Sequence, residues 1–281
     1  MNYEKDNEDK YKEDLWTINR SKYKWFSNYV KLKIFKRWES KVENKDTFLD
    51  MGGGVGNWAF HFIDSYKQVI VCDISNEALK RIPEENIIKK QGSVTKIPLQ
   101  PGSVDCILLA DVFEHIKVQD LDKMMLELKR VLKKEGSIII YTTQYSPTPQ
   151  LLLDKLLGRM DGRLNINEIY SSGHINNLTF RETKNLIKRC GLHLEDYYHY
   201  GILFKHPVDF IKDFLARVIG KLKKDKSLRD GQEIKDKLKN IKNPSMMFKL
   251  IFGTLSFISY LDILLFGKII RGGSIFLRIK K

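Results

Sequence analysis

A glycine-rich turn after a short apolar strand constrains this chain more than any other feature. The stretch Thr47-Phe-Leu-Asp-Met-Gly-Gly-Gly-Val-Gly56 runs from the strand into Gly52, Gly54 and Gly56 and then toward a helix. Glycine adopts positive φ at no steric cost and lets a ligand approach the main chain, while a helix start offers N–H groups for binding. The sequence therefore predicts a ligand-binding loop here.

The residues around this loop narrow the kind of ligand. A dinucleotide fingerprint needs a third glycine where Asn57 stands, and no Gly-Lys-Ser/Thr of a phosphate-binding loop follows. Asp50, just before the glycines, would repel a pyrophosphate and favours a cationic ligand. The alternative is that Asp50 is only a solvated loop acid, since short polar turns favour aspartate.

A second acid stands at the end of the next predicted strand. Gln68-Val-Ile-Val-Cys-Asp73 is typical of a buried parallel strand, and Asp73 lies seventeen residues after Gly56. An acid at about this distance from the loop is placed to accept hydrogen bonds from ribose hydroxyls. The simpler alternative is that Asp73 caps a helix that begins at 76.

Strand and helix patterns alternate along most of the chain. Such alternation predicts an α/β fold with a mainly parallel sheet. An aromatic-rich helix over 11–42 is expected to pack across the glycine loop, and Thr179-Phe-Arg-Glu182 is a capping box for a helix that ends near Gly191. The expected strands are 47–51, 68–73, 86–90, 104–110, 136–143, 195–205 and 273–279, and the other expected helices are 56–66, 75–82 and 118–133.

Further segments complete a family resemblance. Gln91-Gly-Ser93 and Ile97-Pro-Leu-Gln-Pro-Gly-Ser-Val-Asp105 are followed by Leu108-Leu-Ala-Asp-Val-Phe-Glu-His-Ile116. With the glycine loop, they resemble class I S-adenosylmethionine-dependent methyltransferases, in particular the ubiquinone-type and methyltransferase-11-like small-molecule branch. The resemblance implies S-adenosylmethionine as cofactor, whose ammonium and sulfonium suit an acidic loop. The cofactor-binding residues that it implies are Asp50, Gly52, Gly54, Gly56, Asp73, Ile74, Ser93, Val94 and Asp111.

The resemblance also implies a Rossmann-like, doubly wound seven-stranded sheet whose last strand is antiparallel and inserted between its neighbours. Gly273-Ser-Ile-Phe-Leu-Arg-Ile-Lys280 is the candidate for that strand. The chain departs from the family at Ser93, where an acid commonly contacts the adenine, and at Glu135, which replaces the usual proline. The Ser93 hydroxyl or the main-chain N–H of Val94 could still make the adenine contact.

This topology divides the chain into parts. We expect an N-terminal helical cap over 1–45, a cofactor-binding core over 46–205, a basic and apolar helical insertion over 206–271, and the final core strand over 272–281. Three cysteines without a Cys-x-x-Cys pair indicate a reducing compartment, and the mixed-charge N-terminus lacks the apolar stretch of a secretory signal. The protein is therefore expected in the cytoplasm.

Positive charge is concentrated near the C-terminus. Residues 212–281 carry seventeen Lys or Arg against six Asp or Glu, in a chain whose total charge is +14. Apolar residues at helical spacing are interleaved with these charges, which suits contact of 207–270 with an anionic membrane surface, or plain packing on the domain. The longest uncharged run there, 250–261, has twelve residues, whereas a membrane span needs about 20. Peripheral contact with the inner membrane face is the form of membrane association that this pattern favours.

Nucleic acid is not expected as a partner despite the basic charge. Amino-methylating enzymes that act on bases carry an Asn or Asp-Pro-Pro-aromatic stretch after the fourth strand, where this chain has Ala110-Asp-Val-Phe113. The Pro-Cys nucleophile of cytosine C5 enzymes is missing as well. We expect a small-molecule or lipid-linked acceptor instead.

Two histidines are the candidate catalytic residues. An acceptor hydroxyl needs a base, and His115, after the fourth strand, is the first candidate because histidine titrates near neutral pH. His174, in Ser171-Ser-Gly-His-Ile175, is the second. Alternatively, His115 only binds main chain at a helix start and His174 is an ordinary loop residue.

A divalent metal ion is the remaining question about this segment. Asp111, Glu114 and His115 resemble the corresponding segment of ubiquinone-type O-methyltransferases, some of which use a divalent ion. No second ligand pair is visible in the sequence, so no metal is expected.

The sequence thus predicts an S-adenosylmethionine-dependent methyltransferase that acts on oxygen of a small-molecule, lipid-linked or glycan acceptor. Two alternatives stay open. The chain could bind S-adenosylmethionine or associate with membranes without catalysing a reaction, or it could be an NAD-dependent oxidoreductase.

Overall fold

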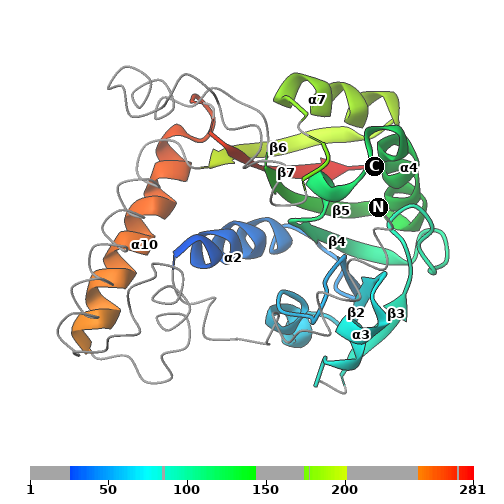
Figure 1. Cartoon of the computed structure of the whole chain (residues 1–281), viewed down its shortest axis with the longest axis horizontal. Helices are drawn as coiled ribbons and strands as arrows, with labels where there is room; N and C mark the ends of the chain where they lie inside the picture. Colours follow the sequence, from blue (N-terminus) through cyan, green and yellow to red (C-terminus); the bar gives the residue numbers. More distant parts are fainter. Residues whose placement is uncertain (1–25, 84–85, 144–173, 177, 201–245, 271) are drawn as a thin grey trace.

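The computed structural model describes residues 26–83, 86–143, 174–176, 178–200, 246–270 and 272–281, which form one seven-stranded sheet flanked by helices (Figure 1). The strands are β1 (Thr47–Met51), β2 (Gln68–Asp73), β3 (Ile87–Gln91), β4 (Val104–Ala110), β5 (Leu132–Thr143), β6 (His193–Tyr200) and β7 (Ser274–Lys280). The helices are α2 (Phe26–Glu39), α3 (Asn76–Lys80), α4 (Leu121–Val131), α7 (Phe180–Arg189) and α10 (Met246–Phe266), with 3-10 turns η2 (Ala59–Ser65), η3 (Phe113–His115) and η4 (Val118–Asp120).

The strand order confirms the predicted fold. The sheet runs β3-β2-β1-β4-β5-β7-β6, with parallel pairing from β3 through β5. Strand β7 is antiparallel to both β5 and β6 and lies between them, as expected for the stretch that ends at Lys280. This is the doubly wound sheet with an inserted last strand.

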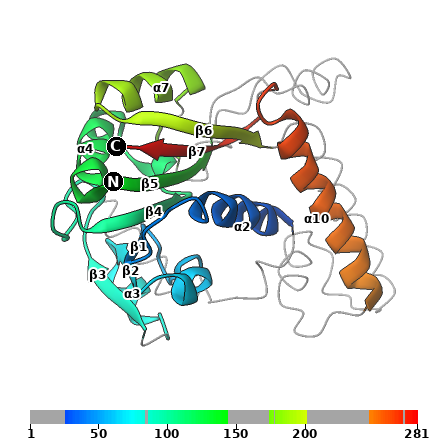
Figure 2. The same cartoon turned by 180° about the vertical axis from the view of Figure 1, so that it is seen from behind.

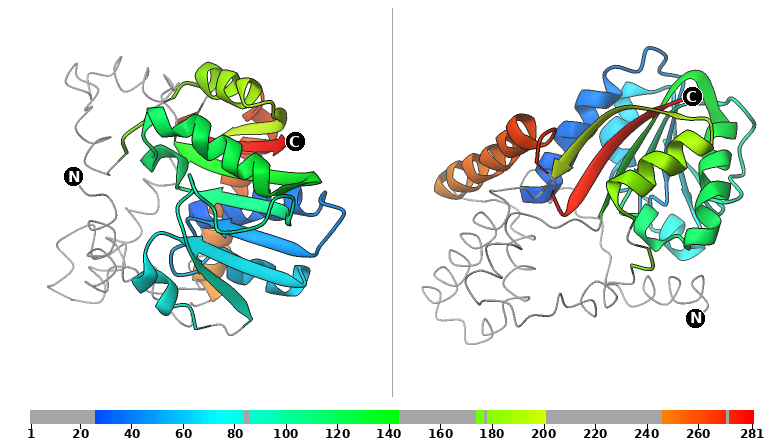
Figure 3. Two further views of the ribbon diagram at one scale, coloured as in Figure 1. Left: turned by 90° about the vertical axis from the view of Figure 1, so that its right-hand side faces the viewer. Right: turned by 90° about the horizontal axis from the view of Figure 1, so that it is seen from above.

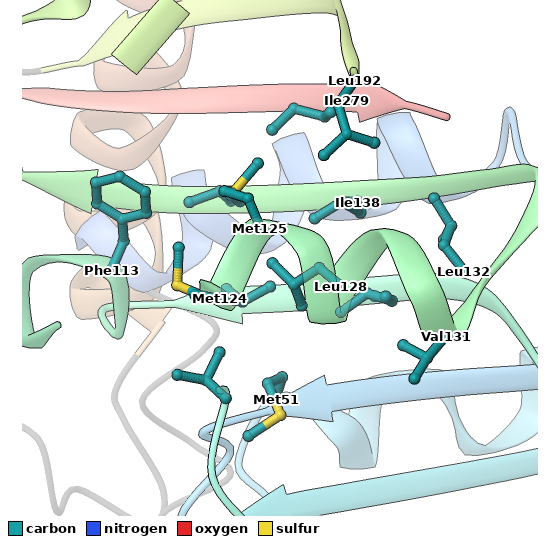
Figure 4. Packing of buried hydrophobic residues seen from close by; sticks show 14 of the residues in the cluster. Met51, Phe113, Met124, Met125, Leu128, Val131, Leu132, Ile138, Leu192 and Ile279 are labelled. Atoms are coloured by element: carbon teal, nitrogen blue, oxygen red, sulfur yellow. The ribbon is translucent and has the colours of Figure 1, made fainter. Parts of the chain in front are cut away.

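Both faces of the sheet are buried, which explains why its strands are nearly continuous apolar runs. Phe48 of β1 belongs to the cluster that includes α2 and η2, while its neighbour Leu49 belongs to the cluster on the opposite face. On that second face, Met124, Met125 and Leu128 of α4 pack onto the sheet (Figure 4). The views in Figure 3 show α2 and α10 on one side of the sheet and α4 and α7 on the other.

The local sequence signals are largely confirmed, with two differences. Thr179 forms the expected capping box with Glu182 at the start of α7, and Gly191 after the helix has φ 66°. The predicted helix over 56–66 is the shorter 3-10 turn η2, because Gly56 has φ 75° and right-handed helical backbone can begin only after it.

Strand β5 begins at Leu132 rather than at 136. Leu132 lies opposite Val104, and the regular pairing with β4 resumes at Ser137 opposite Cys106, so residues 133–136 form a bulge in the strand. The lysines in this stretch do not prevent strand structure, because Lys133 pairs with Asp46 and Asp105.

Helices α2 and α10 lie against each other beside the last strands (Figure 2). Trp38 of α2 stacks on Tyr198 of β6 and donates its Nε1–H to Asp196 at 3.0 Å. Residues 11–25 of the predicted N-terminal helix, 201–205 of the predicted sixth strand and 206–245 of the predicted insertion lie outside the described residues. The domain boundaries therefore stay predictions.

None of the described helices combines the length and the apolar character that crossing a membrane requires.

Candidate functional site

The candidate site lies where the direction of strand succession reverses. From β1 the sheet continues to β2 and β3 on one side and to β4 and β5 on the other. In open α/β sheets, ligands bind beyond the carboxyl ends of the strands at such a point, because the loops diverge there. The residues that follow β1, β2 and β4 therefore share one edge of the sheet.

The glycine loop has the backbone conformation that its sequence predicts. Gly52, Gly54 and Gly56 have φ of 72°, 53° and 75°, a region that side chains rarely adopt. A Cβ on Gly52 would lie 2.5 Å from Cγ2 of Val112. The loop after β1 is thus in direct contact with the loop after β4, and a larger residue at position 52 would force them apart.

Asp73 ties the glycine loop to the end of β2. One carboxylate oxygen accepts from the Gly54 N–H at 2.8 Å, and the other accepts from the Ser75 N–H at 2.9 Å. The N-cap of α3 is Ser75, whose hydroxyl accepts from the Ala78 N–H, so the alternative of Asp73 as the cap is wrong. These bonds hold the Asp73 carboxylate at the carboxyl end of β2, beside the glycine loop.

Asp50 is buried beneath the loop and is not a solvated loop acid. Its side chain is 1% exposed and accepts from the Ala59 N–H at 3.0 Å. Burial raises its pKa to about 7, and the nearby charge of Asp73 acts in the same direction. A cation bound beside it would favour the ionised form, because opposite charges stabilise each other.

The expected adenine loop is a tight turn after β3. The Ser93 hydroxyl accepts from the Thr95 N–H at 3.2 Å, and Val94 is buried. Arg130 of α4 donates to the carbonyl oxygens of Ile97 and Leu99, both at 2.8 Å, which anchors the loop to the core. Ile74 begins the connection after β2, where its carbonyl oxygen accepts from the Gln91 side chain at 3.1 Å.

Asp111 makes an ion pair that no local sequence pattern indicates. It follows β4 with φ 58° and receives two hydrogen bonds from the Lys31 ammonium, at 2.6 and 2.9 Å. Lys31 comes from α2, is 8% exposed, and lies 3.9 Å from the centre of the Tyr141 ring. The N-terminal helix thus reaches the site through one side chain.

The structure brings the two candidate histidines together. Their rings are 5.1 Å apart and meet edge to face. Asn176 fastens the segment that carries His174, since its side-chain amide donates to the carbonyl oxygens of Phe113 and Ile116, both at 2.7 Å. Burial and the adjacent His115 lower the pKa of His174, which keeps its imidazole neutral at neutral pH.

Glu114 is the third side chain in the group formed with His115 and His174. It is 1% exposed, accepts a hydrogen bond from the Thr142 hydroxyl at 2.8 Å, and has its pKa raised to about 7 chiefly by burial. Ligand atoms of Glu114, His115 and His174 lie within 4.8 Å of one another, a spacing that could hold a metal ion. The sequence did not reveal this grouping, because His174 is distant from the other two along the chain.

Comparisons with known proteins agree with this geometry. Residues 49–140, which span β1 through most of β5, match the model of a family described as a methyltransferase domain. Over this segment the chain resembles class I S-adenosylmethionine-dependent methyltransferases. The matched region contains the glycine loop, Asp73 and the segment after β4.

Curated relatives match the same part of the chain. A methyltransferase-like protein of Schizosaccharomyces pombe is 30% identical over 128 residues, covering 43% of this chain and 48% of its own. A ubiquinone/menaquinone biosynthesis C-methyltransferase of Francisella tularensis is 27% identical over 138 residues, covering 43% and 54%. The chain thus spans about half the length of these relatives.

Solved structures share the fold. Phosphoethanolamine N-methyltransferase 2 of Haemonchus contortus, in complex with S-adenosyl-L-methionine, has a TM-score of 0.55 and 17% identity, covering 91% of this chain and 52% of that one. A geranyl diphosphate methyltransferase has a TM-score of 0.54 and 12% identity, covering 90% and 77%. At these identities the likeness shows the fold of this chain alone.

Sequence reasoning missed several residues of the candidate site. Lys31, Tyr141 and Asn176 reach it from α2, from β5 and from the segment before α7. Each acts through a contact with a residue remote in sequence, which periodicity cannot reveal. The signal that could have found Asn176 is its position two residues after His174.

Proposed function

We propose that this chain transfers a methyl group from S-adenosylmethionine to the oxygen of a small-molecule or lipid-linked acceptor. The observation that carries the proposal is the contact between the rings of His115 and His174. His115 lies on the loop after β4, and this loop contacts the glycine loop through Val112. In this proposal the glycine loop binds the cofactor and the histidines supply a proton acceptor on a neighbouring loop.

The residues of the cradle fit this cofactor. The Asp73 carboxylate lies beside the glycine loop, where a charged acceptor suits ribose hydroxyls, and the buried carboxyl of Asp50 suits a cationic ligand. A Cβ on Gly53 would lie 2.7 Å from the Asp50 carboxyl group, so the loop is shaped closely around this acid. The matched methyltransferase domain supports the same choice over NAD.

For this reaction the protein must mainly position the acceptor and remove its hydroxyl proton. S-adenosylmethionine supplies a methyl group that is already activated by its sulfonium. Holding the acceptor in line with that bond can contribute several kcal/mol. His174, neutral at neutral pH, accepts the hydroxyl proton as the oxygen gains the methyl group, and His115 supports its orientation through their edge-to-face contact.

Similar proteins include a C-methyltransferase and an N-methyltransferase. Oxygen is proposed as the acceptor atom because the two histidines offer a base for a hydroxyl. A nitrogen acceptor that is already neutral would not need one. The rate effect of removing the histidines therefore bears on the acceptor as well as on the mechanism.

The test is methyl transfer from radiolabelled S-adenosylmethionine into a cell extract separated into lipid and aqueous fractions. The wild type is expected to label one product, and His174→Asn to slow labelling about 100-fold or more, the usual range for a lost general base. His193→Asn, at an exposed position on β6, is the matched control and should leave the rate unchanged. Equal rates for all three proteins would refute the base, and absence of any labelled product would favour a non-catalytic binding protein.

Removing divalent metal ions with EDTA distinguishes a histidine base from a metal site. With the histidines acting as the base, the labelling rate is expected to be the same in EDTA. Loss of activity in EDTA and its return with magnesium would instead assign Glu114, His115 and His174 to a metal ion.

A further inference from the structure

The loop after β3 lies next to the end of β2, where Asp73 stands. In the sheet, β2 lies between β3 and β1, the strand that leads into the glycine loop. A cofactor bound with its ribose at Asp73 and its sulfonium at the glycine loop therefore places its base over the loop after β3. This loop also contacts the end of β2 directly, because the Gly92 N–H donates to the Asp73 carbonyl oxygen at 3.0 Å.

Two hydroxyl groups on this loop lie outside the core. Val94 is buried in the hydrophobic cluster that includes α4, whereas Ser93 and Thr95 on either side of it are only half-buried. The hydroxyl oxygens of Ser93 and Thr95 are 3.0 Å apart, and the Ser93 hydroxyl also accepts from the Thr95 N–H at 3.2 Å. We call Ser93 and Thr95 the hydroxyl pair.

The main chain that carries the hydroxyl pair is fixed at both ends. After it, the Ile97 N–H donates to the Glu127 carboxylate at 2.8 Å, which ties the loop to α4. Before it, a Cβ on Gly92 would lie 2.5 Å from Cδ of Pro98, so the start of the loop is closely packed. The hydroxyl oxygens are therefore held in place, while the hydroxyl hydrogens can rotate.

The hydroxyl pair can present either a donor or an acceptor to a ligand. Each hydroxyl carries one hydrogen, and the bond between the two oxygens, in which either can be the donor, uses only one of the two hydrogens. The other hydrogen can be donated to a ligand, or the pair can turn and accept from one. A carboxylate in the same place is an acceptor only. The loop 92–99 contains no acid.

We infer that the hydroxyl pair binds position 6 of the cofactor's purine and accepts either a donor or an acceptor there. Position 6 carries the amino group of adenine, which is the only hydrogen-bond donor of that base and points away from the ribose. The ligands that fit are sulfonium and thioether nucleosides whose purine has an amino group, a hydrogen or an oxygen substituent at this position. The inference rests on the cofactor site of the proposed function, and not on the methyl acceptor or the histidines.

Calorimetric titration of the full chain with two ligands tests the inference. One ligand is S-adenosylhomocysteine, and the other is its analogue with hydrogen in place of the 6-amino group. The wild type is expected to bind the analogue no more than about threefold more weakly, since a neutral hydrogen bond contributes little. Ser93→Asp should raise this ratio of dissociation constants to at least about tenfold, because a carboxylate binds the amino group more strongly. Its carboxylate can still accept from the Thr95 N–H, so the turn is kept.

The matched control is Ser103→Asp. Ser103 belongs to the same connection between β3 and β4, but it stands just before β4, at the opposite edge of the sheet from the hydroxyl pair. Its hydroxyl donates to the Gln100 carbonyl oxygen at 2.7 Å. The variant adds the same charge away from the base, so its ratio should equal that of the wild type. A wild-type ratio as large as that of Ser93→Asp, or of about tenfold or more, would overturn the inference.

A second pair of ligands compares a donor with an acceptor in the wild type alone. The homocysteine thioethers of N6-methyladenosine and of 6-methoxypurine riboside carry substituents of nearly equal size, but the first offers a donor and the second an acceptor. Their dissociation constants are expected to agree within about threefold. A preference of about tenfold or more for the donor would overturn the inference and leave the cofactor assignment intact. Failure of the wild type to bind S-adenosylhomocysteine would instead contradict the cofactor site itself.

Discussion

At the scale of single residues, the site contains acids that are costly to ionise. Asp50 has a pKa of about 7 in the fold, against 3.8 in the unfolded chain. The folded state therefore holds a proton that the unfolded state has released, so this residue's contribution to stability falls as pH rises from about 4 to about 7. A buried carboxyl that weakens the fold at neutral pH is typical of a residue kept for binding.

Asp50→Asn is expected to remove this pH dependence. The amide oxygen can still accept from the Ala59 N–H, so the variant should melt at or above the wild-type temperature at pH 8. At pH 5 this advantage should be gone, because the wild-type carboxyl is then protonated. Melting curves of both proteins at the two pH values check this, and a constant difference between them would contradict the assigned burial cost.

In the ion pair of Lys31 and Asp111, removing the acid should destabilise the fold more than removing the lysine. Lys31 is nearly buried, whereas the Asp111 side chain is 45% exposed. Removing the acid leaves a buried cation without its anion, which costs more than leaving a half-exposed carboxylate in water. Asparagine also tolerates the positive φ of position 111, so the backbone is not a complication.

Asp111→Asn should therefore lower the melting temperature more than Lys31→Met. Thermal unfolding at pH 7 measures both, and the exposed pair of Arg189 with Asp122 supplies the control. Asp122→Asn is expected to have little effect, since exposed ion pairs contribute roughly 0–1 kcal/mol. A larger loss for Lys31→Met would show that the helix contact, not the buried charge, dominates.

At the scale of elements, hydrogen bonds between two short segments hold the two candidate histidines together. The segment 174–176 is held on η3 by main-chain bonds from Ile175 and Asn176 to the Glu114 carbonyl oxygen and by the Asn176 side chain. His174 owes its place beside His115 to these bonds.

Asn176→Ala should weaken this attachment of 174–176 to η3. It leaves the Phe113 and Ile116 carbonyl oxygens without this donor, at a cost of roughly 1–3 kcal/mol for each buried group left unsatisfied. We expect kcat to fall with cofactor affinity unchanged, since the cradle lies on other loops. Single-turnover rates and calorimetry together measure this split, and a parallel loss of cofactor affinity would contradict it.

Elements with local signals were predictable from sequence, and contacts between elements were not. The glycine loop, the capping box at Thr179 and the apolar strands each depend on neighbouring residues, and the inserted last strand followed from the family resemblance. The contact of Lys31 with Asp111 and the burial of Asp262 in α10 depend on how elements pack. The side on which Asp262 faces cannot be read from a helix that is apolar almost all round.

At the scale of the whole molecule, the candidate site and helix α10 lie at different parts of the sheet. The glycine loop and His115 follow strands β1 and β4, where the strand order reverses, while α10 lies against α2 and β6.

The central claim is that the glycine loop and Asp73 bind the cofactor. Calorimetric titration with S-adenosylhomocysteine tests it most directly, with Asp73→Ala and Gly54→Val as site variants and Asp122→Asn as control. The wild type and the control are expected to bind at micromolar concentrations, and both site variants to lose at least about tenfold in affinity. Unchanged affinity in folded Asp73→Ala and Gly54→Val, or no binding by the wild type, would contradict it.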